Sequence, residues 1–183
     1  MSPCARSRKF GRAPARLVFF PNVISIVKLL VRRSASVARM GGARRWLLAE
    51  AALWLAVAWL ALLVLRFRTI ASHLGQSLTP AQAIARMAEA PTSSDAPALV
   101  RDIAGAVRLA AAHLPFPTLC LQQALAAKWM LRRRRITGVL HLGVATRKGP
   151  EGAMTAHAWL DAAGVEVTGC PVTSEYTEVA CFV

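Results

Sequence analysis

The chain has 183 residues, of which 55% are hydrophobic, and this length suits one domain with an extension. Its formal net charge is +14, but eleven basic residues precede the first acidic residue, Glu50, and the remainder is only mildly basic. The basic part lacks interleaved aromatic residues and any zinc or RNA-binding motif, so we expect no nucleic acid partner.

Residues 1–43 are predicted to form an extension, and residues 44–183 the domain. Arg, Ser, Pro and Gly dominate the start of the extension, and its apolar runs are too short to cross a bilayer. This composition is typical of a disordered arm. It would also suit attachment to an anionic membrane surface. Met40 is an alternative start of the protein.

The most apolar segment is Trp46–Leu65, which contains a single charge, Glu50. Its length meets the requirement for a transmembrane helix, and arginines flank it at both ends. The many alanines and Glu50 equally suit a buried helix around which a small core is built. The sequence leaves both alternatives open, so we expect a cytoplasmic protein that is either free or associated with a membrane.

Helices are predicted next, followed by strands. The expected helices are Phe67–Gly75, Ala81–Glu89 after an N-cap at Thr79, Ala98–His113, and Leu119–Arg135 after an N-cap at Thr118. The expected strands are Ile136–Thr146, Ala153–Asp161, Val165–Thr168 and one in the tail Thr173–Val183. This order predicts an α+β fold in which a helical N-terminal half packs on a small antiparallel sheet.

Cys120 and His157 are the strongest candidates for catalysis. Cys120 falls in the first turn of a predicted helix, where the positive end of the helix dipole favours a thiolate. A thiol at a helix start beside a strand imidazole is the arrangement of papain-like nucleophilic catalysis. Taken singly, a buried cysteine is more often a small apolar residue. Trp159 shares a strand face with His157 and could shield the pair or pack the core. His141, on the neighbouring strand, is a competing base.

The other cysteines point to neither a metal site nor a disulfide framework. Cys4, Cys120, Cys170 and Cys181 match no zinc ribbon, and we expect reduced thiols. A disulfide between Cys170 and Cys181 is the alternative, and it would require an oxidising compartment. Cys120, His141, His157 and Cys170 include no closely spaced ligand pair, so no metal is expected. There is no phosphate-binding glycine loop, and no cofactor is expected either.

The segment Cys120–Ala126 (CLQQALA), the basic turn after it, and Ala156–Leu160 (AHAWL) resemble the lasso-peptide biosynthesis B proteins. These are bacterial transglutaminase-like cysteine proteases that remove the leader from a ribosomally made lasso precursor. The likeness covers about residues 44–180 and implies a transglutaminase-like, papain-like core. It also implies that Cys120 is the nucleophile and His157 the general base. Two alternatives stay open: a membrane-anchored or partner-docked scaffold with a degenerate protease site, and a transglutaminase-type acyl transferase.

The resemblance also implies partners and a third catalytic group. The partners are the precursor peptide, an ATP-dependent macrolactam synthetase and, because residues 1–45 are too short to form a peptide-binding domain, a separate leader-recognition protein. With a three-residue turn at Ala162–Gly164, His157 falls opposite Gly169, which has no side chain. Asp161 shares the face of His157 but lies about 13 Å along the strand. A backbone carbonyl is therefore one candidate for orienting the imidazole.

Overall fold

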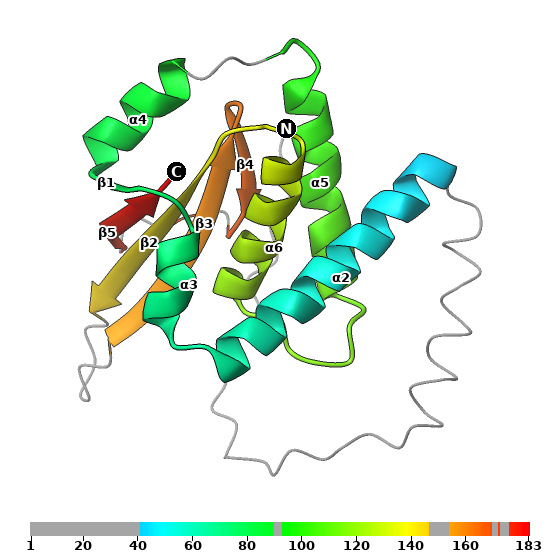
Figure 1. Cartoon of the computed structure of the whole chain (residues 1–183), viewed down its shortest axis with the longest axis horizontal. Helices are drawn as coiled ribbons and strands as arrows, with labels where there is room; N and C mark the ends of the chain where they lie inside the picture. The colour runs from blue at the N-terminus through cyan, green and yellow to red at the C-terminus, as the bar shows by residue number, and fades with distance from the viewer. Residues whose placement is uncertain (1–40, 90–92, 147–153, 170–171, 173–175) are drawn as a thin grey trace. The chain divides into compact units, whose positions relative to one another are not determined.

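The computed structural model describes residues 41–89, 93–146, 154–169, 172 and 176–183. The predicted extension lies almost wholly outside these residues, as do the loop 147–152, Cys4 and Cys170. The chain divides into units 1–39 and 40–183, and the description concerns the second. The helices are α2 (Gly42–Val64), α3 (Phe67–His73), α4 (Pro80–Glu89), α5 (Ala96–Ala111) and α6 (Cys120–Arg133). The strands are β1 (Ser77–Leu78), β2 (Gly138–Thr146), β3 (Met154–Ala162), β4 (Val165–Thr168) and β5 (Thr177–Phe182) (Figure 1).

The strands form one antiparallel sheet in the order β1-β5-β2-β3-β4, which confirms the predicted α+β class. β2 and β3 pair without interruption from Gly138 to Thr146. The turn from β3 to β4 is shorter than predicted, because Ala162 pairs with Val165. Only Ala163 and Gly164 lie between these partners, and both have positive φ, as a tight hairpin turn requires.

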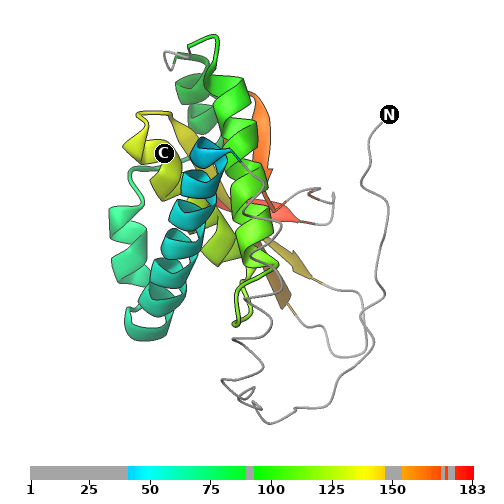
Figure 2. The same cartoon turned by 90° about the vertical axis from the view of Figure 1, so that its right-hand side faces the viewer.

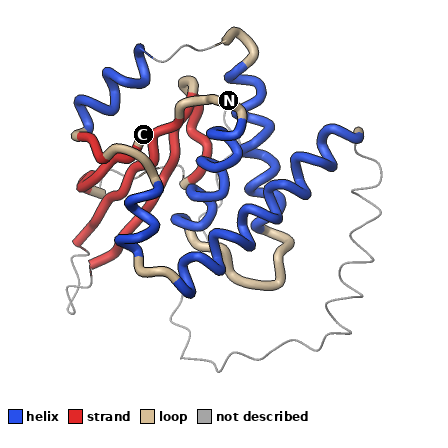
Figure 3. Tube along the Cα trace, viewed as in Figure 1, coloured by secondary structure: helices blue, strands red, loops and turns tan. Residues whose placement is uncertain are grey.

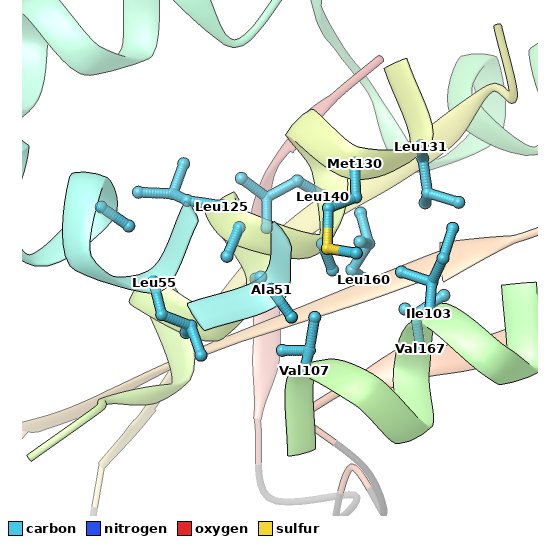
Figure 4. Packing of buried hydrophobic residues seen from close by; sticks show 14 of the residues in the cluster. Ala51, Leu55, Ile103, Val107, Leu125, Met130, Leu131, Leu140, Leu160 and Val167 are labelled. Atoms are coloured by element: carbon cyan, nitrogen blue, oxygen red, sulfur yellow. The ribbon is translucent and has the colours of Figure 1, made fainter. Parts of the chain in front are cut away.

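Helices α5 and α6 pack on one face of the sheet, and α2 packs across both of these helices (Figures 1 and 2). α6 lies at the centre of this helical layer, in contact with α2, α5 and strands β2, β3 and β4. Leu140 and Leu160 of the sheet pack in the same buried cluster as Leu125 and Leu131 of α6 (Figure 4). Side chains alternate along a strand. The odd-numbered residues of β2 and β3 therefore point to the opposite face.

The opposite face of the sheet carries a smaller cluster. Figure 3 shows α4 at the β1 end of the sheet, away from α2 and α5. Ala83 of α4 packs there with Val139 of β2 and Cys181 of β5. Thr79 begins α4 as predicted: its N–H donates to Gln82 Oε1, and its hydroxyl accepts from the Gln82 N–H. The sheet thus separates two sets of side chains, one facing α6 and one facing α4.

A buried lysine joins α6 to the sheet. Lys128 Nζ donates to the carbonyl of Gly138 at the start of β2, at 3.0 Å, and to that of Phe182 at the end of β5, at 2.9 Å. Burial lowers the pKa of Lys128 to about 8. Both hydrogen bonds use backbone carbonyls, so they fix the position of the helix against two strands that are far apart in sequence.

Glu50, the one acidic residue of α2, has a partner inside the protein. Arg134, just after α6, donates to both carboxylate oxygens of Glu50, at 3.1 and 2.7 Å. This hydrogen bonding is the main reason why the pKa of Glu50 is lowered. Arg133 adds an ion pair at 3.4 Å from an exposed position. The arginine run at the end of α6 is therefore more than a solvated helix end, because Arg134 forms an ion pair inside the protein.

α2 has two apolar faces with different surroundings. Ala51, Leu55 and Ala58 are fully buried against the other helices. The large apolar residues Trp46, Leu53, Val57, Leu60, Leu63 and Val64 are exposed. Among the described residues α2 is the one helix long and apolar enough to cross a membrane, and 17% of that stretch is buried. It is therefore a core helix on one side and an uncovered apolar surface on the other.

Leu55 and Leu53 offer a matched test of this packing. Leu55 is 0% exposed and Leu53 is 60% exposed. We predict that Leu55→Ala lowers the free energy of unfolding by about 2–5 kcal/mol, because it leaves a cavity. Leu53→Ala should change it by no more than about 0.5 kcal/mol. Urea denaturation of the full chain measures both, and equal losses would contradict the assignment of the buried face.

Candidate active site

The start of α6 positions Cys120 in the first helical turn, as predicted. The N-cap is Leu119, one residue later than expected. Its N–H donates to Gln122 Oε1 at 2.7 Å, so a glutamine side chain caps the helix start. The hydroxyl of Thr118 instead donates to the carbonyl of Ala111 at 3.5 Å, and the predicted threonine cap is wrong for this reason.

Cys120 is half-buried and carries a free thiol. It packs against the cluster of buried residues between the helices and the sheet. Helical spacing places it on one stripe with Ala124, Ala127 and Leu131, all of which are fully buried. The first N–H groups of a helix have no partner within the helix. A carbonyl oxygen held beside Cys120 would therefore find hydrogen-bond donors there.

His157 is held by a backbone carbonyl. Its Nε2 lies 2.6 Å from the oxygen of Gly169, just beyond β4. This bond places the ring proton on Nε2 and leaves Nδ1 with a lone pair that could accept a proton. Gly169 has φ +78, and a Cβ there would lie 2.4 Å from the carbonyl oxygen of Ala158. A side chain is excluded at this position, so Gly169 orients the imidazole through its backbone alone.

The pairing of Cys120 with His157 stays a prediction. Ala158 packs in the cluster that Cys120 contacts, and the adjacent His157 points to the opposite face of β3. No contact between them is found among the described residues. β4 ends at Thr168, which pairs with Leu160. Within the described chain, β3 thus has a strand partner on one side only beside His157, and the two faces of the sheet meet at this edge.

His141 belongs to a separate polar network on the face of His157. Its Nδ1 contacts the carboxylate of Glu178, and its Nε2 lies 3.4 Å from Asp161 Oδ2. Its ring stacks on Trp159 with centroids 5.2 Å apart and planes within 3° of parallel. Trp159 also lies beside His157, at 6.1 Å. Asp161 therefore partners His141, while burial raises the pKa of its carboxyl group.

Sequence reasoning missed Glu178, which lies on the same face as Cys181. Residues three apart on a regular strand point to opposite faces. Here Leu142 pairs with Ala180 while Gly143 pairs with Glu178, so β5 has one extra residue, a β-bulge. No signal in the sequence marks this bulge. Tyr176, which precedes β5, was also missed, and its ring lies 5.1 Å from that of His157.

Cys181 is a buried thiol rather than a second nucleophile. It is 0% exposed, and its Sγ donates to Glu178 Oε1 at 2.6 Å. Burial, together with the carboxylate of Glu178, raises its pKa to about 12. Since the thiolate is the reactive form, this cysteine is inert toward substrates at neutral pH. The alternative of a disulfide between Cys170 and Cys181 involves a residue outside the described part of the chain.

A half-buried thiol at the first turn of a central helix, packed on an antiparallel sheet that bears histidines, is a framework for thiol-dependent acyl transfer. The family model of the transglutaminase-like superfamily matches residues 61–181, and the chain belongs to that superfamily. The superfamily includes cysteine proteases and acyltransferases. The matched region contains both Cys120 and His157. No match was found among curated proteins or among solved structures.

Proposed function

We propose that this chain is a cysteine peptidase that removes the leader peptide from a ribosomally made lasso precursor. The observation that carries the proposal is the placement of a half-buried Cys120 at the first position of α6, in a chain of the transglutaminase-like superfamily. His157 adds support, because the carbonyl of Gly169 holds Nε2 and leaves Nδ1 as the basic nitrogen. The lasso substrate rests on the resemblance of the motifs around these two residues.

The proposed chemistry follows from these positions. Nδ1 of His157 accepts the proton of the Cys120 thiol, and the sulfur attacks the scissile carbonyl. N–H groups at the start of α6 donate to the developing oxyanion. The imidazolium gives its proton to the leaving amine, and a thioester joins the acyl group to Cys120. Water, deprotonated by His157, then hydrolyses the thioester and frees the thiol.

The proposal requires Nδ1 of His157 to lie beside the thiol of Cys120. The hydrogen bond between Nε2 and the carbonyl of Gly169 is kept in this pair, because it holds the ring proton on Nε2 and leaves Nδ1 as the base. Any adjustment that brings the two residues together therefore moves His157 and Gly169 as one unit.

Two observations favour a second candidate, a scaffold with a degenerate protease site. Gly169 offers no side chain where the resemblance implies an acidic third catalytic residue, and no hydrogen bond joins Cys120 to His157 among the described residues. Such a scaffold would bind the precursor without cleaving it. A transglutaminase-type acyl transferase would instead join the acyl group to an amine, and the mass of the product distinguishes it from hydrolysis.

The proposed partners are the precursor, a separate leader-recognition protein and the ATP-dependent macrolactam synthetase that receives the freed core peptide. A lasso precursor is linear until its leader is removed, and the new amino terminus is then available for ring closure. The peptidase must therefore act before the synthetase. A separate recognition protein would deliver the leader to a chain whose own described residues form only the helical layer and the sheet.

Cleavage of the precursor, followed by mass spectrometry, tests the catalytic roles. In the presence of the recognition partner, Cys120→Ala should abolish cleavage, and His157→Ala should lower its rate by about 10²–10⁴. His113→Ala is the matched control, because this histidine is exposed at the end of α5. Cleavage that survives Cys120→Ala would refute the assignment of Cys120 as the nucleophile. Precursor binding without cleavage by the wild-type chain would favour the scaffold.

We also propose that the exposed apolar face of α2 associates with an anionic membrane surface. Arg44 and Arg45 precede this face, Arg66 and Arg68 follow it, and such cations attract anionic headgroups. The full chain should co-sediment with anionic vesicles and less with neutral ones. Leu60→Glu on the exposed face should reduce binding without unfolding the protein. Equal binding by this variant would contradict the surface assigned.

A further inference from the structure

The thiol, imidazole and carboxylate beside β5 form a cluster that the proposed peptidase chemistry does not use. His141 lies in the middle of β2, and its backbone partner across the sheet is Cys181. The β-bulge turns Glu178 onto the same face. Nδ1 of His141, Sγ of Cys181 and a carboxylate oxygen of Glu178 all lie within 4.8 Å of one another. We propose that these three side chains bind a zinc ion.

The donor set suits zinc in chemical type. Zinc binds thiolate, imidazole and carboxylate ligands, and a site with three protein ligands leaves its fourth position to water. A thiolate and a carboxylate neutralise the charge of Zn²⁺ when the imidazole is neutral. Binding releases the thiol proton of Cys181 to solvent, and a bond from sulfur to zinc replaces the hydrogen bond from sulfur to Glu178.

The distances fit a tetrahedral site with one adjustment. Sγ of Cys181 and Nδ1 of His141 are 3.8 Å apart. Two such ligands on one tetrahedral zinc would be about 3.6 Å apart, from the usual zinc–ligand lengths. The Glu178 carboxylate lies closer, at 2.6 Å from Sγ, and would move outward by about 1 Å. Its side chain is 24% exposed, and it therefore has room on the solvent side.

Asp161 provides the outer support that such a site needs. With Nδ1 of His141 bound to zinc, the ring proton is on Nε2, which lies 3.4 Å from Asp161 Oδ2. This Nε2 and Asp161 Oδ1 are buried without a hydrogen-bond partner among the described residues. A carboxylate that accepts a hydrogen bond from a metal-bound histidine fixes the orientation of the histidine ring and strengthens metal binding. Asp161 is thus a positioning residue, and Trp159 holds the ring from its stacked face.

Metal binding to the purified full chain tests the proposal independently of cleavage. After equilibrium dialysis with zinc and excess magnesium, we expect one zinc per chain by elemental analysis. Cobalt in its place should give a thiolate-to-metal charge-transfer band. Cys181→Ser should abolish the band and the bound zinc, and Asp161→Asn should weaken binding by about 10–100-fold. Cys120→Ala is the control and should bind as the wild type does.

Glu178→Gln is a second test in case Cys181→Ser does not fold, because the side chain of Glu178 is partly exposed while Cys181 is fully buried. This variant should keep its circular dichroism spectrum and lose the rise in melting temperature that zinc gives the wild type. Absence of stoichiometric zinc in the wild type would overturn the proposal. So would full binding by folded Cys181→Ser or Glu178→Gln. Neither result would affect the role proposed for Cys120, which lies on the other side of the sheet.

Discussion

The structure depends on the burial of α6 between two helices and the sheet. This helix contacts elements on every side, and the hydrogen bonds from Lys128 to Gly138 and Phe182 fix its position along the strands. Removing one partner of a buried charged group destabilises a protein strongly, by about 3–5 kcal/mol for ion pairs. The start of α6, and with it Cys120, therefore has little freedom to move. Any rearrangement that brings Cys120 and His157 together must therefore involve His157, which lies on the sheet.

The sheet divides the polar chemistry of the molecule into two parts. Cys120 faces the helical layer, whereas His157, His141 and Cys181 occupy the opposite face. On that face the β-bulge in β5 and the stacked ring of Trp159 organise a compact network of buried polar groups. The edge of β3 where Gly169 binds His157 is where the two parts could act together. This division explains why one histidine suits catalysis at that edge, while the other suits a metal.

The sequence predicts the order and type of the main elements well, because each has a local signal. The run of helix-forming residues after Pro117 marks α6, and Thr79-Pro80 marks α4. Side-chain contacts across the sheet were harder to predict, since they depend on register. A two-residue turn replaced the expected three-residue turn, and Asp161 consequently pairs with Glu166. The place of Glu178 beside His141 and the sheet face on which His157 lies both depend on strand pairing. No short segment of the sequence determines that pairing.

The reaction of Cys120 with iodoacetamide tests the central claim, that Cys120 and His157 act as a pair, without knowledge of the substrate. Peptide mass spectrometry follows alkylation of Cys120 in the full chain. A neighbouring imidazole promotes reaction of the thiol, so His157→Gln should react at least about tenfold more slowly than the wild type. His141→Gln should react as the wild type does. Equal rates for the wild type and His157→Gln would contradict the pair.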